Sequence, residues 1–140
     1  MIDYSDVEEV IEKCFKEMEQ ASRAKYDAEQ ADRTAALCLM AQMKLSMLIE
    51  EIELKAKMAK NEVSRIEGEC YFNEKTNSND KKLTESMLSH TIAKSAGIVD
   101  AKRACAEAES EVKKWNYVMK TIEASHIYFR NASKSKQWAE

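Results

Sequence analysis

The sequence predicts an all-α protein in which long, antiparallel, coiled-coil-like helices are joined by a polar segment containing a short helix. The 140 residues include no proline and only two glycines, Gly68 and Gly97. Proline and glycine mark turns, which an all-β fold needs in large number, so the composition excludes such a fold. Charged residues make up 34% of the chain, and apolar residues recur at helical spacing over most of its length. Both features are typical of long helices and coiled coils.

The first predicted helix covers residues 5–31. Ser5 followed by Glu8 forms a capping box, which satisfies backbone N–H groups at a helix start. The apolar pattern is weakest over residues 22–34, and we place the break between the first two helices near Asp32–Thr34. The second predicted helix covers residues 33–72.

Residues 37–49, LCLMAQMKLSMLI, are apolar at ten of 13 positions, and these positions point all around the helix. A simple intramolecular core would explain the pattern. A core shared between protomers explains it better, because about three helices cannot cover every side of this segment. Methionine also suits adaptable interfaces. We therefore expect a homo-oligomer, with interface residues Met40, Met43, Met47, Trp115, Met119 and Ile122.

A polar loop is predicted over residues 73–83, followed by a short helix over residues 84–93 with Thr84 as its N-cap. Gly97 is expected to break that helix. From Ile98 to Phe129, apolar residues alternate at spacings of three and four, which is the seam of a coiled coil. This pattern predicts a long final helix over residues 98–133, followed by a frayed tail.

Charge is unevenly distributed along the chain, whose formal net charge is −3. Residues 1–53 contain 6 Lys/Arg and 13 Asp/Glu, whereas residues 54–140 contain 16 and 12. Any single basic cluster has an ordinary explanation as a solvated helix face. Together the clusters indicate a polyanion site near the polar loop, because a local basic patch can bind phosphate even on an acidic protein. The lysines expected at this site are Lys55, Lys57, Lys60, Lys81 and Lys82. The first three are expected to project from a helix end.

Residue patterns for catalysis or metal binding are sparse. Glu123 and His126 form one ExxH pair, but a di-iron helical bundle needs two such pairs, and the residue three before His90 is Met87. The four cysteines form no CxxC pair and have no histidine nearby, so we interpret them as free apolar residues in a reducing compartment. We expect no catalytic residue, metal or cofactor. The acidic N-terminus and the lack of a long apolar run predict a cytoplasmic protein with no membrane segment.

Two stretches resemble a known family: RIEGECYFNEKTNSNDKKLTESML, ending at Leu88, and DAKRACAEAESEVKKWNYVMKTIEASHIYFRNAS, ending at Ser133. The matching motifs are Lys82-Leu83-Thr84-Glu85 at a helix start, Ala101-Lys102, and Ala108-Glu109-Ser110-Glu111-Val112 in the final helix. Over residues 50–133 the chain resembles the small recombination mediator proteins of bacteriophages, typified by UvsY.

The resemblance implies a helical oligomer, in this family often a ring, that binds single-stranded DNA. Such mediators help a RecA-like recombinase displace single-strand-binding protein and start a filament. A phage-encoded protein of this kind acts in the host cell cytoplasm. Lysines at the break would contact phosphates without reading bases, and the acidic first helix would contact a protein partner. The alternative is a coiled-coil interaction or inhibitor protein that binds no nucleic acid, which the net negative charge favours.

Overall fold

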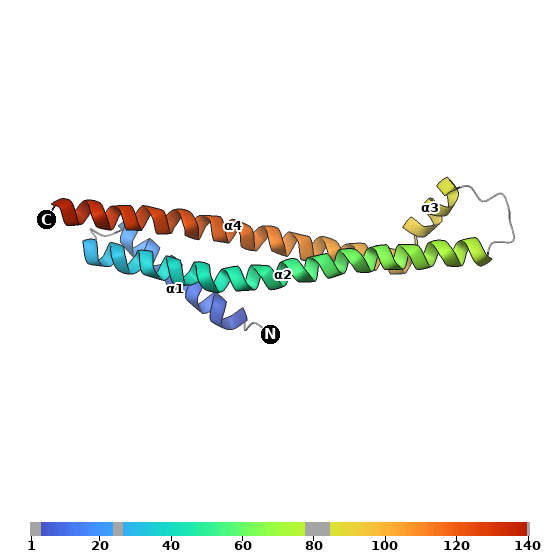
Figure 1. Ribbon diagram of the computed structural model, residues 1–140, viewed down its shortest axis with the longest axis horizontal. Coiled ribbons are helices and arrows are strands. Elements are labelled where there is room, and N and C mark those ends of the chain that lie inside the picture. Colours follow the sequence, from blue (N-terminus) through green and yellow to red (C-terminus); the bar gives the residue numbers. More distant parts are fainter. Residues whose placement is uncertain (1–3, 24–26, 78–84, 140) are drawn as a thin grey trace. The chain divides into compact units, whose positions relative to one another are not determined.

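The computed structural model describes residues 4–23, 27–77 and 85–139 (Figure 1). All regular elements in these ranges are α-helices: α1 (Tyr4–Arg23), α2 (Ala28–Asn77), α3 (Glu85–Ala93) and α4 (Ala96–Ala139). The long helices α2 and α4 pack against each other in antiparallel directions, and α3 lies between them in the sequence. The predicted fold class is confirmed. None of the described helices has an apolar stretch long enough to cross a membrane.

The chain divides into two compact units. Unit 1 contains residues 1–51 and 113–140, and unit 2 contains residues 52–112. The long helices α2 and α4 are each divided between the two units. Each unit is described separately below.

In unit 1, two polar contacts fix the register of α2 against α4. The Ser133 hydroxyl donates a hydrogen bond to the Ala28 carbonyl (3.2 Å), and His126 Nδ1 lies 2.9 Å from the Ala35 carbonyl oxygen. A carbonyl can only accept, so Nδ1 carries the proton. The two contacts are seven residues apart on both helices and run in opposite directions. This is the repeat expected of an antiparallel coiled coil.

Helix α1 covers one side of this pair with an apolar stripe of buried side chains. Val7, Ile11, Cys14 and Ala21 are at most 8% exposed. Cys14 and Cys38 meet between α1 and α2, with their sulfurs 3.3 Å apart. The hydrogen bond to Cys14 and burial raise the pKa of Cys38, and accepting that bond lowers the pKa of Cys14. The two thiols therefore behave as a buried hydrogen-bonded pair.

In unit 2, α3 anchors the segments of α2 and α4 that it faces. Leu88 and Ile92 of α3 and Ile98 of α4 form a buried cluster, and Ile66 and Cys70 of α2 pack against it. The chain turns at residues 94 and 95, where the backbone N–H of residue 95 donates to the Ile92 carbonyl (3.0 Å). The residue at position 97 lies in the first turn of α4, so the expectation that this glycine ends α3 is wrong.

The boundary between the first two helices differs from the prediction. Helix α1 ends at Arg23 and not at residue 31, and α2 begins at Ala28 and not at residue 33. The reason is a cap: Asp27 Oδ1 accepts a hydrogen bond from the Gln30 N–H at 2.8 Å.

Both long helices also extend further than predicted. Helix α2 continues to Asn77, so residues 73–77 of the predicted polar loop are helical. Residues 78–83 of that loop and the predicted N-cap Thr84 lie outside the described ranges. Helix α4 runs from Ala96 to Ala139 and includes most of the tail expected to fray after residue 133. Ser133 is buried against the start of α2. This contact stabilises α4 at the end of its apolar seam.

Candidate nucleic-acid interface

The three lysines predicted on α2 are exposed, but they do not share one face. At 100° per residue, Lys57 and Lys60 lie on one side of α2, whereas Lys55 lies about 160° around the helix from Lys57. The prediction that they project from a helix end is wrong, because α2 continues to Asn77. The other two predicted residues, Lys81 and Lys82, lie outside the described part of the chain.

The face that carries Lys57 and Lys60 continues along α2 through Ser64, Tyr71 and Lys75 at intervals of three, four or seven residues. Lys75 Nζ lies 5.4 Å from the centre of the Tyr71 ring and 3.5 Å from its hydroxyl oxygen. An ammonium group over an aromatic ring is attracted to its π-face. This face therefore combines exposed positive charge with an aromatic ring, and we call it the Lys57–Lys75 face.

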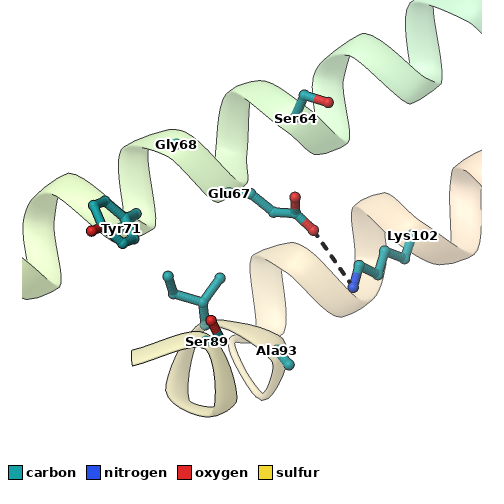
Figure 2. A pocket seen from close by; sticks show the side chains of 8 residues that line it. Ser64, Glu67, Gly68, Tyr71, Ser89, Ala93 and Lys102 are labelled. Carbon is teal, nitrogen blue, oxygen red and sulfur yellow. Dashed lines mark ion pairs between the residues drawn. The ribbon is translucent and has the colours of Figure 1, made fainter. Parts of the chain in front are cut away.

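A pocket of about 500 Å³ opens beside the Lys57–Lys75 face (Figure 2). Ser64, Gly68 and Tyr71 of α2 form one wall, and Ser89 of α3 lies opposite. Glu67, Ile92, Ala93 and Lys102 complete the lining, and Lys102 Nζ lies 3.5 Å from Glu67 Oε1. Hydroxyl groups, an aromatic ring, apolar side chains and one ammonium–carboxylate pair thus line this pocket in unit 2.

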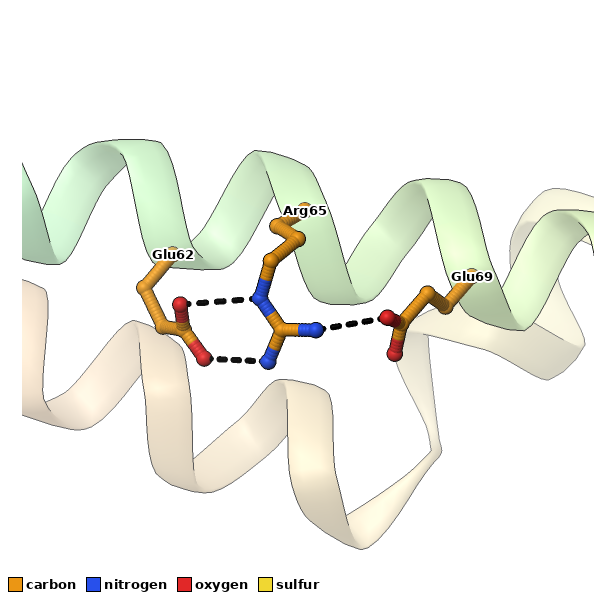
Figure 3. A network of polar contacts seen from close by, with 3 residues as sticks. All are labelled: Glu62, Arg65 and Glu69. Atoms are coloured by element: carbon orange, nitrogen blue, oxygen red, sulfur yellow. Dashed lines mark hydrogen bonds and ion pairs between the residues drawn. The ribbon is translucent and has the colours of Figure 1, made fainter.

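Arg65 is not available for a polyanion, because two carboxylates of its own helix hold it (Figure 3). Its guanidinium donates to both oxygens of Glu62 and, from Nη1, to Glu69 Oε1 at 2.6 Å. The Arg65 guanidinium lowers the pKa of Glu62, and these carboxylates raise the pKa of Arg65. This network neutralises one basic position on α2, whereas Lys57 and Lys60 form no ion pair with a described residue.

Lys60 lies close enough to Cys105 of α4 to affect its titration. Partial desolvation and the Glu109 carboxylate, whose oxygen is 3.8 Å from the sulfur, raise the pKa of Cys105, while the Lys60 ammonium opposes the rise. Lys60 is therefore within electrostatic range of this thiol on α4.

Among the described residues, no group of three or more histidine, cysteine or acidic side chains is arranged to hold a metal ion. His126 of the single ExxH pair is bound to the Ala35 carbonyl, and Glu123 is exposed. The position of His126 fits a structural histidine between two helices.

The residues predicted for the oligomer interface fall into two groups. Met40, Met43 and Met47 of α2 are 50%, 67% and 62% exposed. Trp115 and Ile122 of α4 are buried by the chain itself, and Met119 is half-buried. Of these six residues, only the methionines of α2 offer an open apolar surface in the single chain.

No protein-family model, curated protein or solved structure matches this chain significantly. The resemblance to phage recombination mediators therefore remains a hypothesis carried by the motifs themselves.

Proposed function

We propose that this protein is a non-enzymatic, single-stranded-DNA-binding recombination mediator. In this proposal it self-associates and helps a RecA-like recombinase load onto DNA covered by single-strand-binding protein, in the cytoplasm of the host cell. The observation that supports DNA binding most directly is the Lys57–Lys75 face, where exposed lysines and Tyr71 lie on one side of α2.

The chemistry of this face suits a nucleic acid strand bound without regard to sequence. Lys57 and Lys60 are exposed ammonium groups on one face of a stable helix, and each can neutralise a phosphate. The exposed ring of Phe72, about 100° around α2 from Tyr71, lies at the edge of this face and offers a π-face for a base. Single strands are recognised by this combination of backbone charge and stacking.

One subunit offers few contacts, so the proposal needs self-association. When copies of the chain are joined, each further contact to the same strand forms at a high effective concentration. A weak patch repeated around an oligomer, such as a ring, then gives useful affinity. Because several subunits contact the same strand, the oligomer can stay bound while the recombinase displaces individual subunits.

The test replaces both exposed lysines, as Lys57→Ala/Lys60→Ala, and measures affinity for oligonucleotides of several sequences over a range of salt concentrations. We expect affinity to fall by a similar factor for every sequence. The slope of log affinity against log salt should become shallower by about 0.7 for each phosphate of a single strand that is no longer neutralised.

The matched control is Lys13→Ala/Lys16→Ala on α1. These lysines are also exposed and are paired with Glu9 and Glu12, so the control removes the same net charge far from the proposed face in sequence. If both double variants weaken binding equally, the effect reflects overall charge and the Lys57–Lys75 face is not the site. If the wild-type protein binds no oligonucleotide at low salt, the mediator function is rejected.

The second candidate function is a coiled-coil interaction or inhibitor protein that binds no nucleic acid. The neutralisation of Arg65 and the pairing of Lys102 with Glu67 favour it, because these contacts reduce the positive charge of unit 2. The exposed methionines of α2 would then serve a protein partner alone. Salt-sensitive retention on single-stranded-DNA resin distinguishes the two functions.

A further inference from the structure

One row of exposed side chains follows a heptad pattern along the first part of α2. Its spacing is 3, 4, 3, 4, 3, which is that of a and d positions in a coiled coil. The row is apolar in its middle and carries opposite charges at its two ends. Its members are Arg33, Ala36, Met40, Met43, Met47 and Glu50, all of them exposed.

The core-facing stripe of the same segment lies on the opposite side of the helix. Cys38, Ala41, Leu45 and Leu48 are fully buried. At 100° per residue, the centres of the two stripes are about 150° apart. The segment is therefore apolar on two nearly opposite faces, and the described part of the chain covers one of them.

The exposed row is complementary to itself in the antiparallel direction. When two copies of the row are aligned about the point between Ala41 and Gln42, Met40 of one copy faces Met43 of the other. Ala36 then faces Met47, so a small side chain meets a large one. At the two ends of the row, Arg33 of each copy meets Glu50 of the other.

The end charges select this direction. A parallel pair in register would place Arg33 against Arg33 and Glu50 against Glu50, which is repulsive at both ends. The antiparallel pair has two attractive contacts, separated by about 25 Å of apolar helix face. Within the described part of the chain, neither Arg33 nor Glu50 forms an ion pair that would compete.

We propose that this row binds a second copy of the chain, forming an antiparallel, two-fold symmetric helix pair through α2 of unit 1. The inference gives a geometry to the self-association in the proposed function and needs no nucleic acid. Methionine is flexible enough to fill the contacts between the copies. The row is short, so the pair dissociates on dilution.

The decisive experiment reverses the end charges and measures the dimer dissociation constant by sedimentation equilibrium. Arg33→Glu alone and Glu50→Arg alone each create two like-charge contacts, and each should weaken the dimer about tenfold. The double variant Arg33→Glu/Glu50→Arg restores two opposite-charge contacts in the antiparallel pair only. Its dissociation constant should return to within about threefold of the wild-type value.

A second comparison tests the middle of the row. Met43→Glu places a carboxylate in the apolar contact and should leave only monomer at concentrations where the wild type is dimeric. Tyr117→Glu is the control, because Tyr117 is 75% exposed on α4 and lies outside the row. Circular dichroism should show unchanged helicity for both variants, since both side chains are exposed.

Three results would overturn the inference: a wild-type protein that stays monomeric at the highest soluble concentration, equal effects of Met43→Glu and Tyr117→Glu, or a double charge reversal that stays as weak as the single ones. Oligonucleotide binding is measured on the same samples. If the dimer responds to the charge reversals as expected but binds no DNA, the proposed function is rejected and the antiparallel helix pair is still supported.

Discussion

Single basic residues of the long helices differ in the partners they already have. Arg65 of α2 is held by Glu62 and Glu69, and Lys102 of α4 is held by Glu67. Lys57 and Lys60 remain as exposed positive charges without an ion-pair partner among the described residues. Sequence alone gives all four the same charge. A basic side chain that is already paired with a carboxylate is less able to neutralise a phosphate, so ion pairing determines which of the four can contribute to DNA binding.

At the residue scale, Phe72 should contribute stacking to DNA binding. It is 68% exposed, and it follows Tyr71 directly on α2. Stacking of a base on an aromatic side chain contributes about 1–3 kcal/mol, so Phe72→Ala should weaken single-stranded-DNA binding about tenfold. Fluorescence anisotropy with a labelled oligonucleotide measures the change.

Met58→Ala is the control for Phe72→Ala. Met58 is 62% exposed on the same helix, but it has no aromatic ring. An equal decrease of affinity in the two variants would mean that apolar contact, and not stacking, supports binding at this surface.

At the element scale, Asp27 determines where α2 begins. Its carboxylate accepts the Gln30 N–H, so Asp27→Ala should lower the free energy of unfolding by about 1 kcal/mol. Urea denaturation followed by circular dichroism measures this difference. Asp27→Ser preserves a capping oxygen and should cost less. A result in which both substitutions have the same effect would show that the cap adds nothing beyond helix propensity.

The short helix α3 should depend on its apolar anchors. Leu88 is 4% exposed and packs with Ile92 and Ile98. Leu88→Ala removes three buried carbon atoms and should cost about 3 kcal/mol. Hydrogen exchange of the α3 amides should accelerate accordingly. Ser89→Ala, at an exposed neighbouring position, should leave the exchange rates of the α3 amides unchanged. If the two variants accelerate exchange equally, Leu88 is not the anchor of α3.

The sequence predicted the elements well and their ends less well. Long apolar periodicity identified both long helices, and the N-cap pattern at Thr84 identified the short helix after the polar segment. Asp27 and Gln30 have the spacing of a capping box, but the weak apolar pattern over residues 22–34 moved the predicted boundary to Asp32–Thr34. The extension of α4 past residue 133 depends on Ser133 meeting the first turn of α2, a long-range contact that no local pattern contains.

The candidate site was only partly predictable for a similar reason. Lysines near the polar segment and the neighbouring Tyr71 were identified from the sequence, but the contact between Lys75 and Tyr71 and the pocket lined by Lys102 are known only from the geometry. Helical periodicity applied to residues 55–60 would have separated Lys55 from Lys57 and Lys60. The buried positions of Trp115 and Ile122 depend on which helices pack together, so their seam pattern alone does not separate an internal core from an oligomer interface.

At the scale of the whole molecule, the acidic first helix remains the predicted contact for a protein partner. Glu8, Glu9 and Glu12 are exposed on α1, whereas Val7 and Ile11 are buried. Glu8→Gln/Glu9→Gln/Glu12→Gln should therefore weaken capture of a RecA-like recombinase while DNA affinity stays the same or rises, because less negative charge repels phosphate. Pull-down and anisotropy on the same preparation measure the two effects.

A deletion is a poorer test of the same prediction. Removing residues 1–20 also removes buried Val7, Ile11 and Cys14, and it uncovers Cys38, so the truncated protein should be less stable. The glutamine variants avoid this problem because they change exposed positions only. Weaker DNA binding in these variants, with helicity intact, would contradict the division of roles.

The two opposite stripes of α2 limit how this helix can change in length. Inserting a single amino acid between Cys38 and Leu45 would rotate everything that follows by about 100° relative to everything before it. Part of the buried stripe would then face solvent, and the exposed row would be interrupted at the same point. An insertion of seven residues rotates the helix by about 20° less than two full turns and nearly preserves both stripes. Over this segment, natural variants of the protein should gain or lose α2 residues in sevens, with a matching change in α4.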